Sequence, residues 1–258
     1  VAFMKRFFIL SLLGLSPLFL SACTLDPQKE NSPISQTTVV TSSTAQAESS
    51  QTTKEETVMP IVPESLLQAV TANDLQQVQE LLKNPDYPID EQNEAGETPL
   101  MIATHLNQLE IAKTLIDHGA DINQQDGIQD SPYLYASAQG KTEILDYMLK
   151  NGEPDQQIVN RFGGNALIPA AEKGHLENVK LLLADERVNI DHQNNYGYTA
   201  LIEAVALRDG SAIYQEIVQV LLDNGANKEL RDNYGKTAED YARELGYSQL
   251  LTQLTTTS

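Results

Sequence analysis

The sequence is poor in cysteine and in basic residues, and both shortages exclude functions. Cys23 is the only cysteine among 258 residues, so no disulfide bond can form within the chain. Seventeen Lys and Arg residues stand against 36 Asp and Glu, which gives a formal net charge of −19. Such a charge repels nucleic acid phosphates, so we expect no DNA or RNA partner. The charge either serves solubility alone or steers a basic protein partner toward the chain.

Motifs for catalysis and for metal binding are also missing. No two histidines have the i, i+4 spacing of a helical metal site, and no further cysteine could complete one. There is no G-x-S-x-G elbow and no glycine-rich phosphate loop with a lysine. The acidic pairs Glu55-Glu56 and Glu239-Asp240 are typical of solvated charge. The sequence therefore predicts no enzyme, no cofactor and no small-molecule substrate.

The first 22 residues have the layout of a secretory signal. Lys5 and Arg6 precede an uncharged stretch, residues 7–22. A membrane-spanning helix needs about 20 apolar residues. This stretch is shorter, and Gly14 and Pro17 interrupt it. A basic start, an apolar middle and small residues at the end predict cleavage and export.

The end of this stretch, Leu20-Ser21-Ala22-Cys23, resembles the bacterial lipobox. The resemblance implies that residues 1–22 are a lipoprotein signal peptide and that Cys23 carries the lipid; the alternative is an ordinary signal with a chance cysteine. Two acyl chains would hold the protein stably on a membrane. We expect an extracytoplasmic protein anchored to a bacterial membrane. Because Thr24 follows the cysteine in place of Asp, this is the outer membrane facing the periplasm in a Gram-negative cell; in a Gram-positive cell it is the cell surface.

Residues 23–62 are predicted to be a disordered tether that begins at the lipidated cysteine. Eighteen of the 39 residues from 24 to 62 are Ser, Thr or Gln, and none is aromatic. Such a segment cannot bury enough apolar surface to offset the entropy lost on ordering.

From Pro63 onward the sequence repeats itself at intervals near 33 residues. A small residue recurs with spacings of 34, 33, 34, 34 and 38, at Ala69, Ala103, Ala136, Ala170, Ala204 and Ala242. An apolar pair recurs as Leu81-Leu82, Leu115-Ile116, Met148-Leu149, Leu182-Leu183 and Leu221-Leu222. No such unit can bury its own apolar face, so the units must stack.

These units resemble the ankyrin repeat. The matching segments are GETPLMIA at 96–103, GADIN at 119–123, GHLENVKLLL at 174–183 and GYTAL at 197–201. The resemblance implies an all-α ankyrin-repeat solenoid of about six helix-turn-helix repeats with short β-hairpin loops. The domain is expected over 63–258, with repeats near 63–93, 94–126, 127–159, 160–193, 194–232 and 233–258. A narrower resemblance, to small stand-alone bacterial ankyrin proteins, rests on GKTEIL at 140–145 and NRFGG at 160–164.

Several positions have a clear local chemistry. Thr98 and Thr199 are expected to cap helices, and Pro99 and Pro132 fit first helical turns. The turns before these helices are expected to need positive φ at Gly96, Gly163, Gly197 and Gly235. The longer last spacing indicates an insertion around 207–214, between the two helices of the fifth unit.

In the ankyrin family, partners usually dock on the concave side, which the hairpin tips and first helices form. Transferred to this sequence, that side supplies partner-binding candidates: Ile128, Asp130, Arg161, Phe162, Tyr196, Tyr198 and Tyr234. Tyr is a favoured interface anchor because it offers a large area with few rotatable bonds. The alternative is that these tyrosines pack locally on the next hairpin. Pro169 and Glu203 stand where Leu is usual in the family. They either mark a second functional region or are changes of the kind that ankyrin helices tolerate.

The sequence as a whole predicts a lipid-anchored, monomeric, extracytoplasmic module that binds an unidentified protein, with a basic partner favoured by the charge. One alternative is a periplasmic immunity or inhibitor protein against a secreted toxic enzyme. Another is a structural lipoprotein that maintains the cell envelope.

Overall fold

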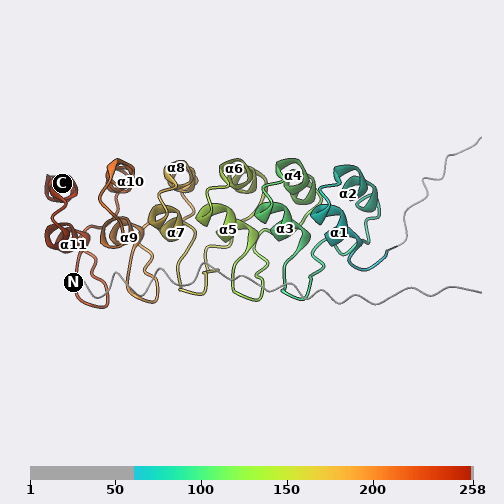
Figure 1. The fold of residues 1–258 in the computed structure, drawn as a ribbon, viewed down its shortest axis with the longest axis horizontal. Coiled ribbons are helices and arrows are strands. Elements are labelled where there is room, and N and C mark those ends of the chain that lie inside the picture. The colour runs from blue at the N-terminus through green and yellow to red at the C-terminus, as the bar shows by residue number, and fades with distance from the viewer. Residues whose placement is uncertain (1–60, 257–258) are drawn as a thin grey trace, which may run out of the picture. The chain divides into compact units, whose positions relative to one another are not determined.

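Pairs of short helices follow one another through the part of the chain that the structure describes. The structure is a computed structural model that describes residues 61–256. Over this range it is all-helical, with six helix pairs side by side in a row and no strand (Figure 1). The predicted signal peptide, Cys23 and nearly all of the predicted tether lie outside the described residues. The helices are α1 (Ser65–Thr71), α2 (Leu75–Leu81), α3 (Pro99–His105), α4 (Leu109–Asp117), α5 (Pro132–Ala138), α6 (Thr142–Asn151), α7 (Leu167–Glu172), α8 (Leu176–Ala184), α9 (Ala200–Ala206), α10 (Ala212–Asp223), α11 (Ala238–Leu245) and α12 (Ser248–Thr256).

Four of the six first helices in the described chain begin at a Ser or Thr that caps them, and two of these caps are the predicted ones. The hydroxyl of Thr98 accepts the backbone N–H of Met101 at 3.2 Å, and Thr199 accepts that of Ile202 at the same distance. Ser131 and Thr237 cap α5 and α11 in the same way. Each cap satisfies an N–H group that has no partner within the helix, which stabilises the helix by about 1 kcal/mol. The predicted cap positions are confirmed.

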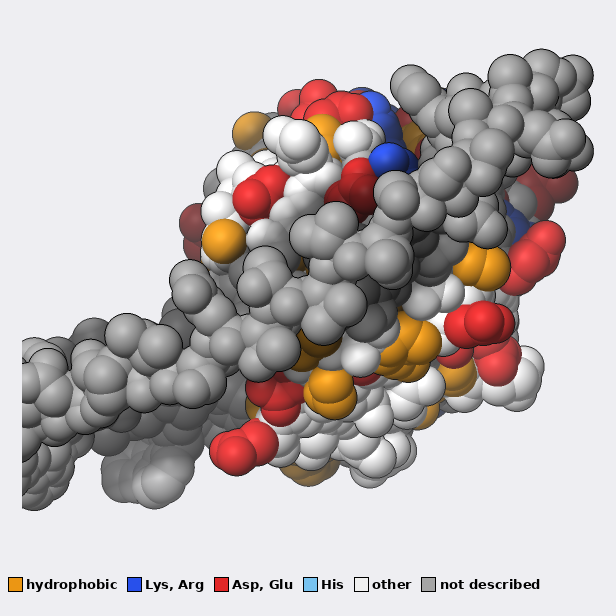
Figure 2. Space-filling model, turned by 90° about the vertical axis from the view of Figure 1, so that its right-hand side faces the viewer, with side chains coloured by type: hydrophobic (Ala, Val, Ile, Leu, Met, Phe, Trp, Pro, Cys, Tyr) orange, Lys and Arg blue, Asp and Glu red, His pale blue; other side chains and the backbone are white. Residues whose placement is uncertain are grey.

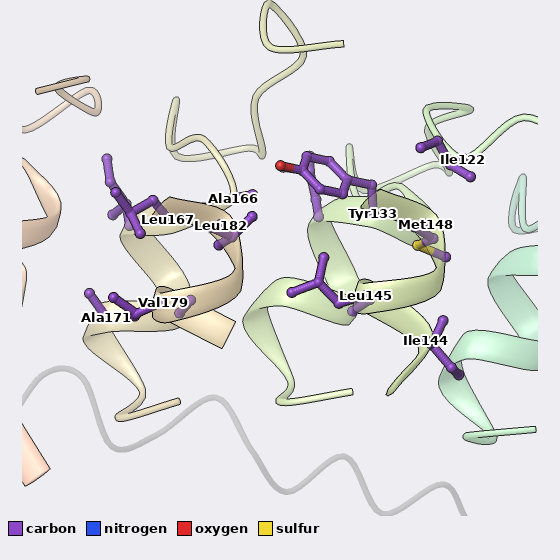
Figure 3. Close-up of a cluster of buried hydrophobic side chains, with 14 of the residues drawn as sticks. Ile122, Tyr133, Ile144, Leu145, Met148, Ala166, Leu167, Ala171, Val179 and Leu182 are labelled. Atoms are coloured by element: carbon purple, nitrogen blue, oxygen red, sulfur yellow. The ribbon is translucent and has the colours of Figure 1, made fainter. Parts of the chain in front are cut away.

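The core runs continuously along the row because every repeat supplies the same kinds of side chain. The six recurring alanines are at most 2% exposed, so successive first helices pack closely. Full burial of a Leu contributes about 2 kcal/mol, so the stack of second-helix leucines is a main source of stability. Figure 3 shows part of this core between α5, α6, α7 and α8, with Tyr133, Leu145, Met148, Leu167, Val179 and Leu182.

The loops that join one pair to the next fold back as tight turns, and the four predicted glycines there have φ between 74° and 80°. In each turn a backbone N–H bonds to the carbonyl four residues later, as from Asn93 to Glu97 at 3.1 Å. One such pair per loop gives hairpin geometry without a strand, so the predicted β-hairpin loops appear only as turns. The second loop differs, because Gln129 holds the left-handed conformation (φ 64°) in place of glycine.

The insertion in the fifth repeat lies where it was expected. It separates α9 from α10, although residues 212–214 already belong to α10. Tyr247, at the start of the last helix, donates its hydroxyl to the carbonyl of Arg208 at 2.5 Å. The insertion is thereby fixed against the C-terminal repeat.

Candidate partner-binding surface

Five tip loops project from one side of the row (Figure 1), at residues 93–97, 126–130, 160–164, 194–198 and 232–236. Each loop begins with an Asn or Asp whose Oδ1 accepts the backbone N–H groups two and four residues later, at 2.8 to 3.0 Å. These residues are Asn93, Asp126, Asn160, Asn194 and Asp232. An Asn or Asp side chain is well suited to fix such a turn. Sequence reasoning missed this position, although its spacing follows the repeat.

The residue two places after this Asn or Asp is the tip residue of each loop. In four successive loops it is large and exposed: Ile128 is 57% exposed, Phe162 42%, Tyr196 43% and Tyr234 65%. The first loop has Ala95 at this position. Isolated exposed apolar side chains are ordinary, but four at equivalent positions of adjacent repeats form a row. We call these four residues the tip row.

Backbone hydrogen bonds connect neighbouring tip loops directly. The N–H of Asn195 donates to the carbonyl of Phe162 at 2.9 Å, and that of Asn233 donates to Tyr196 at 3.0 Å. At the other end of the row, Gly127 donates in the same way to Ala95 at 2.9 Å. The last three tip residues therefore stand on a hydrogen-bonded backbone.

Tyr198 does not belong to this exposed row, and its prediction as a surface residue is wrong. Its side chain is buried, with 6% exposed. Its hydroxyl lies 3.2 Å from that of Tyr241, and the two rings meet edge to face with centroids 6.1 Å apart. Tyr198 follows the turn and points into the repeat row, so it supports the loop from beneath. The local-packing interpretation holds for Tyr198, whereas Tyr196 is exposed.

Asp130 and Arg161 come together from adjacent loops. Nη1 of Arg161 lies 3.5 Å from Oδ2 of Asp130, and its guanidinium lies 4.8 Å from the ring centroid of Phe162. Burial raises the pKa of Asp130, and the charge of Arg161 opposes that shift. Three of the predicted candidates thus form one contact group at the junction of the third and fourth repeats.

Glu203 and Pro169 are both buried in first helices. Glu203 is 5% exposed, and its Oε1 accepts a hydrogen bond of 2.9 Å from Nδ2 of Asn194. Burial, and then the charge of Glu172, raises the pKa of Glu203 to about 8. A carboxyl group with this pKa is mostly neutral at pH 7, as expected for an acid inside the repeat row. The side chain of Glu203 therefore offers a partner little direct contact.

A contact between a histidine ring and a tyrosine ring connects the first helices of the second and third repeats. The rings of His105 on α3 and Tyr135 on α5 have centroids 4.1 Å apart, and Nδ1 of His105 lies 3.1 Å from Glu97. These contacts belong to the second and third repeats, next to the Asp130–Arg161 pair. Both of these contacts join His105 to other residues of this chain.

The described residues offer an exposed surface for binding. Between residues 61 and 256, no three His, Cys, Asp or Glu side chains are placed to hold a metal ion. A hollow of about 330 Å³ has Gly140, Gly174 and His175 among its lining residues and none of the tip row. No helix in this same range is long and apolar enough to cross a membrane. On the end that α1 and α2 form, acidic side chains are prominent among the coloured residues (Figure 2).

Comparison with known proteins places the repeats in a family. The model for ankyrin repeats in three copies matches residues 66–158 and 133–232, more than half of the chain. The ankyrin repeat protein YahD of Escherichia coli (strain K12) is 43% identical over 155 residues, which are 60% of this chain and 77% of YahD. The crystal structure of the ankyrin repeat protein EF0377 has 55% identity and a TM-score of 0.76, and the match covers 77% of this chain and 100% of that one.

A more distant match is a structure of the predatory endopeptidase Bd0816 from Bdellovibrio bacteriovorus in complex with the immunity protein Bd3460. Its TM-score is 0.63 at 23% identity, and it covers 76% of this chain and 98% of the matched chain. At that identity the likeness shows the fold alone. The first two relatives confirm the resemblance to small bacterial ankyrin proteins. The chain belongs to the ankyrin-repeat family, whose members are generally non-enzymatic modules that bind other proteins.

Proposed function

We propose that this chain is a lipid-anchored extracytoplasmic module that binds a protein partner through its tip row. The observation that carries the proposal is the row of Ile128, Phe162, Tyr196 and Tyr234, all exposed at equivalent positions of adjacent repeats. Large side chains on a rigid backbone lose little conformational entropy when a partner covers them. The buried Tyr198 and the Asn or Asp of each turn supply that rigidity.

The overall charge favours a basic partner. Without residues 1–22, which carry Lys5 and Arg6, 15 basic residues stand against 36 acidic ones, a net charge of −21. Such a field accelerates the encounter with a positively charged protein and weakens as salt rises. The association rate should therefore fall steeply with ionic strength, whereas the dissociation rate should depend mainly on the tip row.

The membrane anchor is the part of the proposal that rests on the sequence alone. Support comes from Leu20-Ser21-Ala22-Cys23 after an apolar stretch, with the only cysteine of the chain at its end. Cells grown with a labelled fatty acid should yield labelled wild-type protein in the membrane fraction. Cys23→Ser should carry no label and should leave that fraction. Equal labelling of the two proteins would rule out lipidation at this residue.

The binding role is tested by crosslinking in intact cells, followed by mass spectrometry of the captured protein. The triple variant Phe162→Ala, Tyr196→Ala, Tyr234→Ala should lose the captured partner. A matched control, Ile61→Ala with Val62→Ala, removes exposed apolar side chains just before the first repeat and should keep the captured partner. Unchanged capture by the triple variant would exclude the tip row.

The same experiment separates the two alternative roles. An immunity role predicts that the captured partner is a secreted enzyme, bound stoichiometrically and inhibited when the purified proteins are mixed. A structural role in the envelope predicts no stoichiometric partner, together with envelope defects on deletion of the gene.

A further inference from the structure

Lys173 differs from most basic residues that the structure describes. Most lysines and arginines between residues 61 and 256 lie within 4.0 Å of a carboxylate. Lys173, just after the end of α7, makes no such ion pair within this range, although charged neighbours surround it. The residue as a whole is exposed, so a ligand can approach it.

Two arginines share the surroundings of Lys173. Desolvation lowers the pKa of Lys173 most, and the charges of Arg161 and Arg208 lower it further. The carboxylates of Glu172 and Asp130 act in the opposite direction. Three cations therefore converge with two carboxylates on a chain whose formal charge is −19. These three basic residues come from two adjacent repeats of an otherwise acidic chain.

The two arginines differ in how far they are engaged. Arg208 makes a short, direct contact with Glu172, and its Nε is buried. Arg161 is held more loosely, because its Nη1 lies 3.5 Å from Asp130 and its side chain is 48% exposed. Its guanidinium stacks on the ring of Phe162. A stacked guanidinium keeps its in-plane N–H groups free to bind a carboxylate through two parallel bonds. Arg161 and Lys173 are thus the cations that a ligand can reach.

We propose that Arg161 and Lys173 receive the carboxylate of an acidic side chain of the partner protein, with an adjacent apolar side chain packed on Phe162. The proposal rests on the proposed function and names the anchor within that surface. Charge complementarity decides the occupant, because Lys173 makes no ion pair among the described residues and Arg161 lies 3.5 Å from its one carboxylate partner. A partner that is basic overall can still carry one acidic side chain at this point.

The probe is a library of random 12-residue peptides displayed on phage and selected on the full chain. Wild-type protein should enrich peptides with Asp or Glu at one fixed position next to an apolar residue. Lys173→Glu should weaken binding of those peptides by about tenfold or more, as expected for loss of a charge-assisted hydrogen bond. Replacing the acidic peptide residue with Lys should restore binding to Lys173→Glu. Lys141→Glu is the matched control, because Lys141 is also without an ion pair among the described residues, and it should change binding less than about twofold.

Several results would overturn the proposal. These are a selection without an acidic preference, a Lys173→Glu protein that still selects acidic peptides, and an equal loss in Lys141→Glu. Binding that appears only after Glu48, Glu55 and Glu56 are changed to Gln would identify the occupant as this chain's own segment, and would also overturn it. Lys173 is exposed, and circular dichroism checks that its variant is folded. Loss of the partner in the tip-row triple variant, with no effect of Lys173→Glu, would leave the proposed function standing while this inference fails.

Discussion

Asn194 donates a hydrogen bond of 2.9 Å from its side-chain amide to Glu203, and the oxygen of the same amide accepts the backbone N–H groups of Tyr196 and Tyr198. The buried acid of α9 is therefore linked through one side chain to an exposed tip residue. In the next repeat the same two positions hold Asp232 and Tyr241, and the tyrosine hydroxyl donates to the carboxylate at 2.5 Å. Both C-terminal tip loops are thus tied to their first helices.

The stability of the repeat row should fall as pH rises from about 5 to 9. The folded-state pKa of Glu203 is raised from 4.5 to about 8 by burial and by Glu172, while Asn194 and Arg208 oppose the shift. The folded state therefore keeps a proton that the unfolded state has lost, and this contribution is complete below pH 4.5 and disappears as pH passes 8. Glu203→Gln stays neutral, so we expect it to exceed the wild type by about 2 to 4 kcal/mol at pH 9 and to differ little at pH 5. Urea unfolding at both pH values measures the difference, and a constant offset would contradict the assignment.

Two tyrosines in one loop should respond oppositely to truncation. Tyr196→Ala removes an exposed side chain and should change the free energy of unfolding by less than about 0.5 kcal/mol. Tyr198→Ala leaves a cavity and removes one of the two hydrogen-bond partners of the Tyr241 hydroxyl, so it should cost about 3 kcal/mol. Denaturant midpoints of the two variants provide the measurement. Comparable losses would mean that Tyr196 is part of the core after all.

Two turn residues with positive φ, Gly163 and Gln129, provide a second matched pair of substitutions. Gly163→Ala should destabilise by about 1 to 3 kcal/mol, because φ is +74° and the new Cβ would lie 3.2 Å from the backbone nitrogen of Asn195. Gln129→Gly relieves a side chain held at φ 64° and should be neutral or stabilising by up to about 1 kcal/mol. Thermal unfolding of both variants tests this, and a destabilised Gln129→Gly would show that the Gln side chain contributes more than its backbone costs.

The last repeat should be sensitive at its capping box. Thr237 and Asp240 satisfy each other's backbone N–H groups at 3.1 and 3.0 Å. Thr237→Ala should cost about 1 to 2 kcal/mol and accelerate amide hydrogen exchange in α11 and α12. Because each repeat contacts only its neighbours, exchange in α3 and α4 should stay unchanged. A uniform increase along the row would instead show that the repeats unfold as one unit.

The repeat register and the helix starts could be predicted from the sequence because local chemistry determines them. Thr98 and Thr199 cap helices within three residues of themselves, and the recurring alanines are required wherever first helices touch. The burial of Tyr198 could not be separated from the exposure of Tyr196 by composition, since both are tyrosines of one turn. Their positions relative to Asn194, four and two residues on, would have distinguished them.

The cation cluster was beyond such reasoning for a different reason. The sequence names Arg161 as a partner-binding candidate, but no spacing in it connects Arg161 with Lys173 and Arg208. They come from a helix end and from an insertion, and only stacking of the repeats brings their charges together. Contacts between repeats depend on side-chain direction as well as spacing, so a periodic pattern predicts the row but not its electrostatics.

The backbone bonds between tip loops are interrupted at one place in the described chain. From Phe162 to Tyr196 and on to Tyr234 the loops are joined amide to carbonyl. Side chains cross the preceding junction instead: Asp130 and Arg161 form an ion pair of 3.5 Å, and Gln125 donates to the carbonyl of Val159 at 2.9 Å. Side-chain contacts tolerate more sliding and bending than a backbone hydrogen bond does. The last three tip residues thus form a rigid group, and a more flexible junction separates Ile128 from them. A partner that also contacts Ile128 must immobilise this junction. A partner that contacts only the last three tip residues meets a preorganised surface.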